Sequence, residues 1–213
     1  MGEIIYENQL RYLTSFRKES DQLILEIETF AKEKRVPILD WLSVELLVNL
    51  ISSHKPKRVL EIGTAIGYST IKIAQNLSKR GAVHTIEKSS DNILIANENF
   101  QKSGLTDKIR LFEGDALSIM PQLKKKYDFI FLDADKEDYE NLLDYSVMLL
   151  KKRGILFVDN LLWHGHAAAQ RVPPSYKNST DHIRKFNKKF MQHPKLQSTI
   201  LPVGDGIGLG VRL

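Results

Sequence analysis

The stretch FIFLDADKEDY, residues 129–139, runs from four apolar residues directly into a cluster of acids around a lysine. The apolar part is typical of a buried strand, and a buried strand that ends on carboxylates needs positive charge to neutralise them. Asp133 ends this strand, and Asp159 with Asn160 ends a later one, GILFVDN. If the two strands are neighbours in a sheet, two carboxylates and an amide oxygen meet at one edge, and such oxygen ligands suit Mg²⁺.

A second candidate site lies in VLEIGTAIGYST, where glycines follow a strand and open a helix. Glycines permit a tight turn and a close ligand, and the amides at the helix N-terminus offer hydrogen bonds. The loop departs from G-x-G-x-x-G, because Ala65 and Tyr68 stand where the second and third glycines are expected. This disfavours a nicotinamide dinucleotide and favours a nucleoside ligand without a pyrophosphate.

Two further strands end on polar residues that fit such a nucleoside. The second strand ends at Glu87, whose carboxylate can accept hydrogen bonds from ribose hydroxyls. The third ends in GDA, which places Asp115 and Ala116 beside the expected adenine. Each residue also has an ordinary explanation, such as a surface glutamate or a helix-capping aspartate. Together they favour a ligand site, because open α/β sheets bind ligands at the carboxyl ends of their strands.

The elements that must position these residues alternate between strand and helix from residue 58 onward, which predicts an α/β fold with helices on both faces of a mostly parallel sheet. The expected strands are RVLEIGT, AVHTIEK, KIRLFEGD, YDFIFLD and GILFVDN. The expected helices between them are STIKIAQNLSK, SDNILIANENFQKSG, ALSIMPQLKKK and EDYENLLDYSVMLLKK. We expect Gly104 and Gly154 to form helix caps or left-handed turns.

The first 55 residues predict three helices: YENQLRYLTSFRKE, DQLILEIETFAKEKR and DWLSVELLVNLISS. Val36-Pro37 should break the second, and Asp40 should cap the third. No linker separates these helices from the sheet. We therefore expect one domain over 1–213, with residues 1–55 as a helical cover and 56–213 as the sheet core.

The alternation stops after Asn160. A connection with paired prolines, residues 161–178, is of the kind used as a substrate loop, and a basic helix should follow over roughly 179–192. The last stretch, LQSTILPVGDGIGLGVRL, predicts two strands joined at Asp205-Gly206.

Composition excludes several classes of protein. There are no cysteines, which excludes disulfides, thiolate metal sites and cysteine nucleophiles, and is compatible with a cytoplasmic protein. The apolar runs are far shorter than the ~20 residues that cross a bilayer, so no membrane partner is expected. Net charge is +5, but residues 151–195 hold ten Lys/Arg against two Asp, or +8. Such a basic segment indicates a polyanionic partner or a solvated face.

The motifs EIGTAIGYST, TIEK, GDA, FLDADKEDY and VDN together resemble class I S-adenosylmethionine (SAM)-dependent methyltransferases, and more narrowly the metal-dependent O-methyltransferases of the caffeoyl-CoA and catechol type. The resemblance covers the chain from Val36-Pro37 to the PVGDG hairpin. It implies a Rossmann-like, seven-stranded sheet whose last strand is antiparallel. It also implies SAM and a divalent cation such as Mg²⁺ as cofactors, and a homodimer as the common assembly.

The resemblance also assigns site residues. It makes Asp133, Asp159 and Asn160 the metal ligands, places Asp133 near the methionine part of SAM, and sets Lys136 beside the acceptor hydroxyl. A nearby cation would lower the pKa of Lys136 and let it accept the hydroxyl proton, whereas the alternative is a solvated lysine at a helix start. The expected cofactor-binding residues are Leu39, Glu61, Gly63, Ser69, Glu87, Asp115, Ala116 and Asp133.

Two acceptors compete. VPILDWLSVELLVNLISSHKPKRVLEIGTAIGYST and HPKLQSTILPVGDG look like the bacterial tRNA 5-hydroxyuridine methyltransferases, which favours the tRNA wobble position and 5-methoxyuridine as product. Trp163, in the predicted substrate loop, instead resembles members that act on small catechols or phenylpropanoid thioesters. On the tRNA hypothesis, the expected phosphate contacts are Arg171, Lys177, Arg184, Lys185, Lys188 and Lys189. The first hypothesis is preferred on sequence alone.

Overall fold

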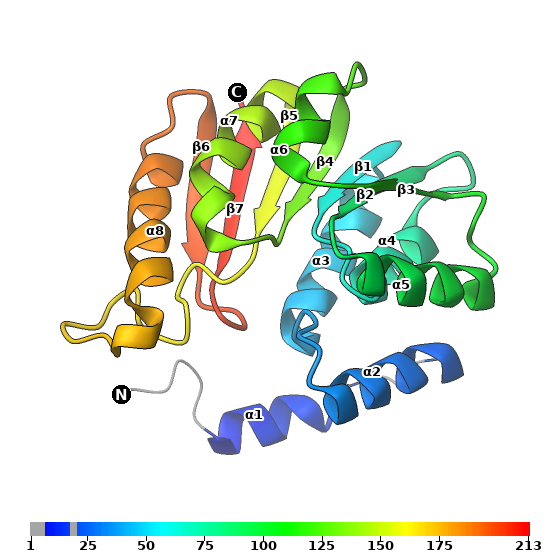
Figure 1. Ribbon diagram of the computed structural model, residues 1–213, viewed down its shortest axis with the longest axis horizontal. Helices are drawn as coiled ribbons and strands as arrows, with labels where there is room; N and C mark the ends of the chain where they lie inside the picture. Colours follow the sequence, from blue (N-terminus) through cyan, green and yellow to red (C-terminus); the bar gives the residue numbers. More distant parts are fainter. Residues whose placement is uncertain (1–6, 18–20) are drawn as a thin grey trace.

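The computed structural model describes residues 7–17 and 21–213 and forms one seven-stranded sheet in the order β3-β2-β1-β4-β5-β7-β6 (Figure 1). The strands are β1 (Arg58–Ile62), β2 (Ala82–Glu87), β3 (Ile109–Glu113), β4 (Tyr127–Leu132), β5 (Leu150–Val158), β6 (Leu196–Leu201) and β7 (Ile207–Arg212). Strand β7 is antiparallel to both of its neighbours, β5 and β6, and the other pairings are parallel. This confirms the predicted Rossmann-like sheet with an antiparallel last strand.

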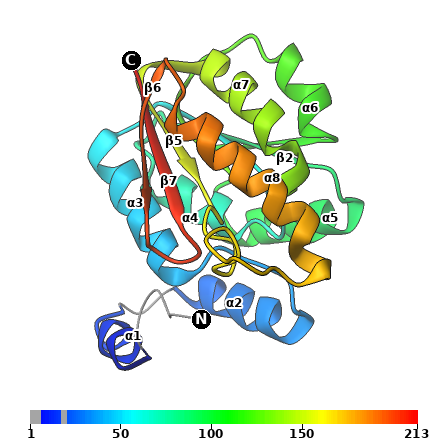
Figure 2. The same ribbon diagram turned by 90° about the vertical axis from the view of Figure 1, so that its left-hand side faces the viewer.

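Helices cover both faces of this sheet, as predicted. They are α1 (Glu7–Thr14), α2 (Gln22–Lys34), α3 (Trp41–His54), α4 (Tyr68–Asn76), α5 (Ser90–Ser103), α6 (Ala116–Ile119), α7 (Tyr139–Leu149) and α8 (Pro174–Met191), with short 3₁₀ turns η1 (Met120–Gln122) and η2 (Lys136–Asp138). Figure 2 shows α3 and α8 on opposite sides of β5 and β7.

The core therefore has two apolar layers, one on each face. The first joins the sheet to α2, α3, α4 and α5, with fully buried Leu47, Phe129 and Phe157. The second joins it to α7 and α8, with fully buried Tyr139 and Phe186. Strands β1, β4 and the second half of β5 are largely buried, and they occupy the middle of the sheet, so their carboxyl ends lie near the centre of the molecule.

The second and third N-terminal helices begin and end within one residue of the prediction, whereas α1 ends at Thr14 and residues 15–17, predicted to be helical, form a turn. The Asp40 carboxylate accepts hydrogen bonds from the amides of Leu42 and Ser43 and so caps α3. Helix α2 ends at Lys34, and Arg35 adopts a left-handed conformation just before Val36-Pro37. The first predicted helix includes Tyr6, Lys18 and Glu19, which lie outside the described residues. Among the described residues, no helix is long and apolar enough to span a bilayer.

Two predicted helices and one predicted glycine turn between residues 116 and 154 differ from the structure. The helix expected over 116–126 is interrupted, because Pro121 lies in a 3₁₀ turn and cannot donate an α-helical hydrogen bond. The helix expected over 137–152 ends at Leu149, since Leu150–Val158 pairs as strand β5. Gly104 is a left-handed cap as predicted, but Gly154 is not; Arg153 adopts the positive φ of 63° instead.

The predicted substrate loop, residues 161–178, is also shorter than expected. Helix α8 begins at Pro174 rather than near residue 179. A proline at the first helical position has a fixed φ and lacks only an amide that the helix leaves unused, so it starts a helix well. The connection after β5 therefore ends at Pro173, and Lys177 lies on α8.

Candidate active site

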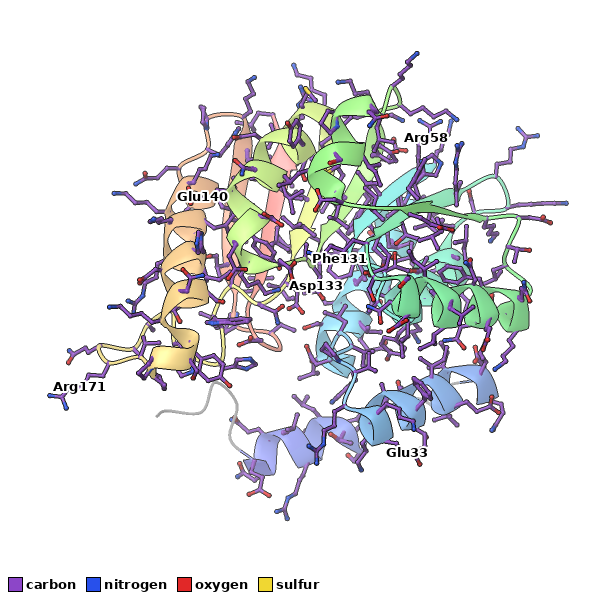
Figure 3. All side chains as sticks on the ribbon, in the orientation of Figure 1. Glu33, Arg58, Phe131, Asp133, Glu140 and Arg171 are labelled. Carbon is purple, nitrogen blue, oxygen red and sulfur yellow. The ribbon has the colours of Figure 1, made fainter. Side chains whose placement is uncertain are left out.

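A cavity of about 530 Å³ opens at the carboxyl ends of β1, β2, β4 and β5. Of the residues predicted to bind ligands, it is lined by Gly63, Glu87, Asp115, Ala116, Asp133, Lys136, Asp159 and Asn160. Asp133 lies at this end of the sheet, whereas Arg58, at the start of β1, lies at the other (Figure 3).

Backbone hydrogen bonds just beyond the strand ends position the two acids. The amide of Asp133 donates to Ile62 O of β1 at 2.9 Å, and the amide of Asp159 donates to Leu132 O of β4 at 3.1 Å. Each acid therefore continues the strand pairing by one residue. Asn160 follows with a positive φ of 62°, which turns the chain away from the sheet. The structure thus brings Asp133, Asp159 and Asn160 to one rim, as the sequence predicts.

The charge at this rim is not balanced by the protein alone. Asp159 is 4% exposed, and its Oδ1 atom is buried with no hydrogen-bond partner. Burial first, and then the neighbouring charge of Asp133, raises the pKa of Asp159 well above its ordinary value. A buried carboxylate oxygen without a donor is costly unless a cation meets it. Within the described residues no cluster of three or more His, Cys, Asp or Glu could hold a metal, so a cation here would also need the Asn160 amide.

Lys136 links these groups. Its buried ammonium donates to Asn160 Oδ1 at 2.7 Å, to Asp133 Oδ1 at 3.1 Å and to the hydroxyl of Tyr139 at 2.8 Å. The Tyr139 hydroxyl in turn donates to Asp159 O at 3.2 Å. Lys136 is therefore not a solvated lysine at a helix start, although it does begin η2.

The protein groups around Lys136 raise its pKa, and the lowered value expected beside a bound cation stays a prediction. Burial alone lowers this pKa, but the charges and hydrogen bonds of Tyr139 and Asp133 outweigh burial and raise it. The protein groups thus favour the ammonium form, and only an added positive charge would act in the other direction.

The glycine loop lies against the same rim. Gly63 has a φ of +98°, and a Cβ atom on it would lie 1.7 Å from the Asp133 carbonyl oxygen. No other residue fits this position, because a side chain would displace the strand end that carries Asp133. Gly67 has a φ of 86° and is the N-cap residue of α4. The loop is thus shaped to let β1 and β4 end close together beside the cavity.

Glu87 and Asp115 hold the adjoining part of the cavity. The Glu87 carboxylate accepts from the Ala65 amide at 2.9 Å and from the Lys88 and Ser89 amides at 3.0 and 2.9 Å. Asp115 caps α6 by accepting from two amides, as its ordinary explanation predicts. Both nevertheless line the cavity, so capping and ligand contact are compatible at these positions.

Three residues predicted to bind the cofactor do not line this cavity: Leu39, Glu61 and Ser69. Pro37 and Ile38 line it instead of Leu39, which is buried in the core. Fully buried Glu61 accepts hydrogen bonds from Ser69 at 2.6 Å, Thr85 at 2.6 Å and Thr70. Burial raises the pKa of Glu61 to about 7, and these hydroxyls oppose the shift. This network supports the glycine loop from beneath.

Sequence reasoning gave no role to Asp205, although it marked the turn that contains it. Asp205 Oδ1 accepts from the His164 amide at 2.6 Å, and Asp205 Oδ2 accepts from Asn160 Nδ2 at 3.4 Å. The hairpin between β6 and β7 therefore holds Asn160 and the start of the loop after β5. Trp163 and His164 line the cavity, and the Trp163 ring centroid lies 5.6 Å from the Lys136 ammonium.

The basic residues predicted to contact tRNA fall into two groups. Arg184 binds the carbonyls of His166, Ala167 and Ala169, and so holds the loop. Lys189 pairs with Asp144 on α7 at 2.7 Å. These two side chains therefore already have intramolecular contacts, and their predicted contact with tRNA stays a prediction. The other four predicted residues, Arg171, Lys177, Lys185 and Lys188, are exposed, and their side chains form no hydrogen bond or ion pair with the described residues. Arg171 points outward, away from Asp133 (Figure 3).

Comparison with known proteins agrees with this geometry. The family model described as O-methyltransferase matches residues 14–213. Caffeoyl-CoA O-methyltransferase 1 of Eucalyptus globulus is 34% identical over 178 residues, which cover 80% of this chain and 71% of that protein. Tapetum-specific methyltransferase 1 of Arabidopsis thaliana is 32% identical over 187 residues, covering 85% and 79%. The chain therefore belongs to the family of SAM-dependent O-methyltransferases.

Solved structures show the same fold. A crystal structure from Staphylococcus aureus, provisionally described as a caffeoyl-CoA O-methyltransferase, has a TM-score of 0.87 at 29% identity and covers 97% of this chain and 98% of its own. The O-methyltransferase from Bacillus cereus in complex with SAH has a TM-score of 0.84 at 26% identity, covering 95% and 96%. Identification of the family from the sequence is thus confirmed.

Proposed function

We propose that this protein transfers the methyl group of SAM to a hydroxyl of a small aromatic acceptor of the catechol or caffeoyl-CoA kind. Overall, the acceptor hydroxyl loses its proton, its oxygen bonds to the methyl carbon, and the bond from that carbon to sulfur breaks. The observation that carries the proposal is that the glycine loop, Asp133, Lys136 and Asn160 all line the same cavity. The curated relatives support the small-molecule acceptor over the tRNA acceptor.

The nucleoside part of SAM fits between the glycine loop and the ends of β2 and β3. Glu87 suits the ribose hydroxyls, and Asp115 with Ala116 lies where the adenine is expected. Gly63 leaves room for the ligand beside the backbone. SAM, when bound, supplies a methyl group on a positively charged sulfur. The SAH complex of the Bacillus cereus protein supports this cofactor here.

Asp133, Asp159 and Asn160 fit a divalent cation such as Mg²⁺. The buried, unpartnered Oδ1 atom of Asp159 is the observation in favour of it. Two carboxylates and one amide leave coordination positions for water or an acceptor oxygen. Such a cation, when bound, lowers the pKa of an acceptor hydroxyl.

Lys136 and Trp163 would orient the acceptor. The Lys136 ammonium points to the same rim as the acids, so it can donate to the acceptor oxygen and stabilise its anionic form. The Trp163 ring lies within reach of that ammonium and offers an apolar surface to an aromatic acceptor. Holding the oxygen in line with the methyl group can contribute about 7–11 kcal/mol through proximity alone.

A transfer assay with radiolabelled SAM tests the proposal. The acceptors are a catechol, caffeoyl-CoA and tRNA that contains 5-hydroxyuridine, each with and without a divalent cation. We expect label in the small aromatic acceptors and its loss on chelation. Labelling of tRNA alone would reject the small-molecule acceptor, and transfer unaffected by chelation would reject the metal.

The tRNA acceptor is a second candidate because exposed Lys177 and Lys185 lie on α8, whose Ser179 lines the cavity. Neutralising both lysines should weaken tRNA methylation and reduce its salt dependence, while leaving a catechol reaction unchanged. Equal tRNA methylation by this variant and the parent would remove the support for that candidate.

The homodimer also stays a prediction. Helix α1 contributes no buried residue; Leu10 and Leu13 on it are 40% and 38% exposed, and Phe16, just after it, is 65% exposed. An apolar face of this kind suits a second copy of the chain. Light scattering during size-exclusion chromatography measures the assembly directly, and a monomer at micromolar concentration would reject the prediction.

A further inference from the structure

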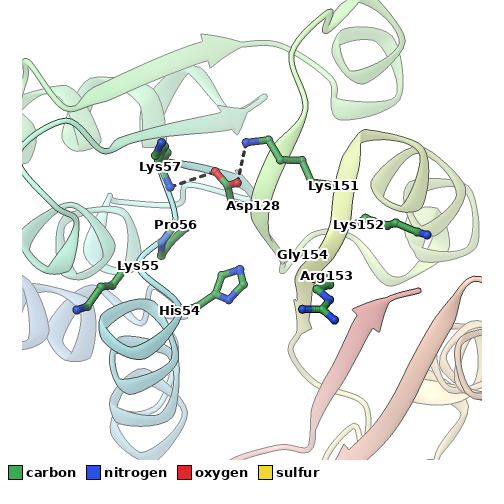
Figure 4. Close-up of a pocket in the computed structure, with 9 residues that line it drawn as sticks. All are labelled: His54, Lys55, Pro56, Lys57, Asp128, Lys151, Lys152, Arg153 and Gly154. Carbon is green, nitrogen blue, oxygen red and sulfur yellow. Dashed lines mark hydrogen bonds and ion pairs between the residues drawn. The ribbon is translucent and has the colours of Figure 1, made fainter.

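A second cavity, of about 310 Å³, is lined by the nine residues drawn in Figure 4. It lies at the opposite end of the sheet from the active site, beside the starts of β1 and β4. It is formed where α3 leads into β1, where β4 begins, and along the first residues of β5. Arg58, which directly follows the lining residue Lys57, lies far from Asp133 in Figure 3. A ligand in this second cavity would therefore not touch the catalytic groups.

The lining of this cavity is strongly basic. Five of its residues are Lys or Arg, and its single acid is Asp128. That carboxylate is already engaged, because Oδ2 accepts from the Lys57 and Arg58 amides at 3.0 and 2.9 Å and Oδ1 pairs with Lys151 at 2.7 Å. Asp128 thus neutralises Lys151 and fixes the floor of the cavity. It leaves the remaining cations unbalanced.

For three of these cationic side chains, the described residues provide no partner that would explain their position. Among the described residues, no hydrogen bond or ion pair engages the side chains of Lys57, Lys152 or Arg153. Lys55 differs, because it caps the C-terminus of α3, where a positive charge complements the helix dipole. Like charges gathered in one hollow repel each other, and a bound anion would remove that repulsion.

The strand geometry places two of these cations at the hollow. Arg153 holds a left-handed φ of 63°, a conformation that disfavours a residue with a side chain. Gly154 follows, and a Cβ atom there would lie 2.8 Å from Lys151 O. The chain therefore bends within β5 at Arg153-Gly154, and Figure 4 shows Lys152 and Arg153 on the side of the hollow opposite Lys57.

We propose that this second cavity binds a compact oligophosphate, such as the di- or triphosphate group of a nucleotide or inorganic polyphosphate. Several cations around a hollow of this size match a short chain of phosphates better than an extended nucleic-acid backbone, which needs a long basic track. The proposal accounts for Lys151, Lys152 and Arg153, the first part of the basic segment 151–195, which the proposed methyl transfer does not use.

Calorimetric titration with sodium tripolyphosphate at low salt tests this site, with no acceptor or SAM present. The pocket variant is Lys57→Gln/Lys152→Gln/Arg153→Gln, which keeps Asp128 and Lys151. The matched control is Lys177→Gln/Lys185→Gln/Lys188→Gln, which removes the same charge from exposed positions on α8. Thermal unfolding of each variant shows whether it is folded. If either triple variant is not, the single variants Lys152→Gln in the pocket and Lys185→Gln as the control on α8 replace the pair.

We expect the parent and the control to bind tripolyphosphate alike, and the pocket variant to bind at least about tenfold more weakly with a smaller salt dependence. ATP should compete with tripolyphosphate. Equal loss of binding in the pocket variant and the control would show only general electrostatic attraction and would overturn the site. Absence of binding to the parent, or binding of a single-stranded RNA but not of tripolyphosphate, would overturn the ligand class.

Discussion

The ammonium nitrogen of Lys136 lies 2.7 Å from the amide oxygen of Asn160, the atom expected to face a bound cation. The same nitrogen lies 3.1 Å from Asp133 Oδ1. Lys136 therefore occupies the space between the strand ends of β4 and β5 and fixes the direction of both side chains. Its role in the reaction is tied to the geometry of the acids, and loss of its charge should disturb both together.

Replacing Lys136 with Met should reduce kcat/KM for the acceptor by about 100-fold. The methionine keeps the buried, unbranched stem but removes the donor to Asn160 and to the acceptor oxygen. The rate of transfer from radiolabelled SAM measures the effect. The control is Lys102→Met, on the exposed part of α5, which should retain parental activity. Parental activity in Lys136→Met would show that the lysine is dispensable.

Asp159→Asn should separate stability from cation binding. The substitution keeps the shape but removes a buried charge whose Oδ1 has no donor and which lies near Asp133. We expect an unchanged or higher unfolding temperature in a chelator, because an unpaired buried charge is lost. The parent should gain stability when Mg²⁺ is added, and the variant should not. Scanning calorimetry with Mg²⁺ or chelator measures both quantities, with exposed Asp181→Asn as the control. A similar Mg²⁺ response in Asp159→Asn would contradict the ligand assignment.

The convergence of Asp133, Asp159 and Asn160 could be predicted because it follows from two local facts. Each acid ends an apolar run, and parallel strands place their carboxyl ends on one edge. The glycine loop was predictable for the same reason. These features need only the order of elements along the chain, and the alternation of strands and helices reveals that order.

The remaining features depend on distances between segments that the sequence does not relate. The contact of Asp205 with Asn160 exists because the β7 hairpin inserts beside β5. Ser69 donates a hydrogen bond to Glu61 and is one of three hydroxyl-bearing residues that surround this buried carboxylate. The sequence motif places Ser69 at the cofactor and gives no sign of this contact. The partners of Arg184 and Lys189 could not be predicted, because helical spacing shows repulsion along one helix but not the contacts with a neighbouring segment.

Gly63→Ala should damage the site and the fold together. The added methyl would lie 1.7 Å from the Asp133 carbonyl oxygen, at a φ that disfavours any side chain. We expect a loss of more than about 3 kcal/mol in the free energy of unfolding, and loss of cation binding because Asp133 must move. Gly104→Ala is the control: it shares a positive φ, but nothing lies within 4 Å of its Cβ position, so its cost should be about 1 kcal/mol. Urea denaturation compares them, and equal costs would refute the close approach.

His84 should make stability depend on pH. Its Nδ1 atom lies 2.9 Å from the Tyr127 hydroxyl in a buried position, and burial with nearby Lys125, Arg110 and Arg58 lowers its pKa from 6.5 to about 4. Between these values the unfolded chain binds a proton that the folded chain does not. Stability from this group is therefore complete above pH 6.5 and is lost as pH falls toward 4, by on the order of 2 kcal/mol.

The comparison of His84→Gln with the parent isolates this effect from other titrating groups. Glu61 acts in the opposite direction, because its raised pKa, about 7, makes the folded chain gain protons as pH falls. Glu61 is present in both proteins, so the difference between their urea-unfolding free energies at pH 4, 5, 6 and 8 reports His84 alone. We expect the free energy of unfolding of the parent to fall relative to that of His84→Gln as pH falls. The exposed control His54→Gln should show the same pH dependence as the parent. A constant difference across this range would show that His84 titrates alike in the folded and unfolded chains.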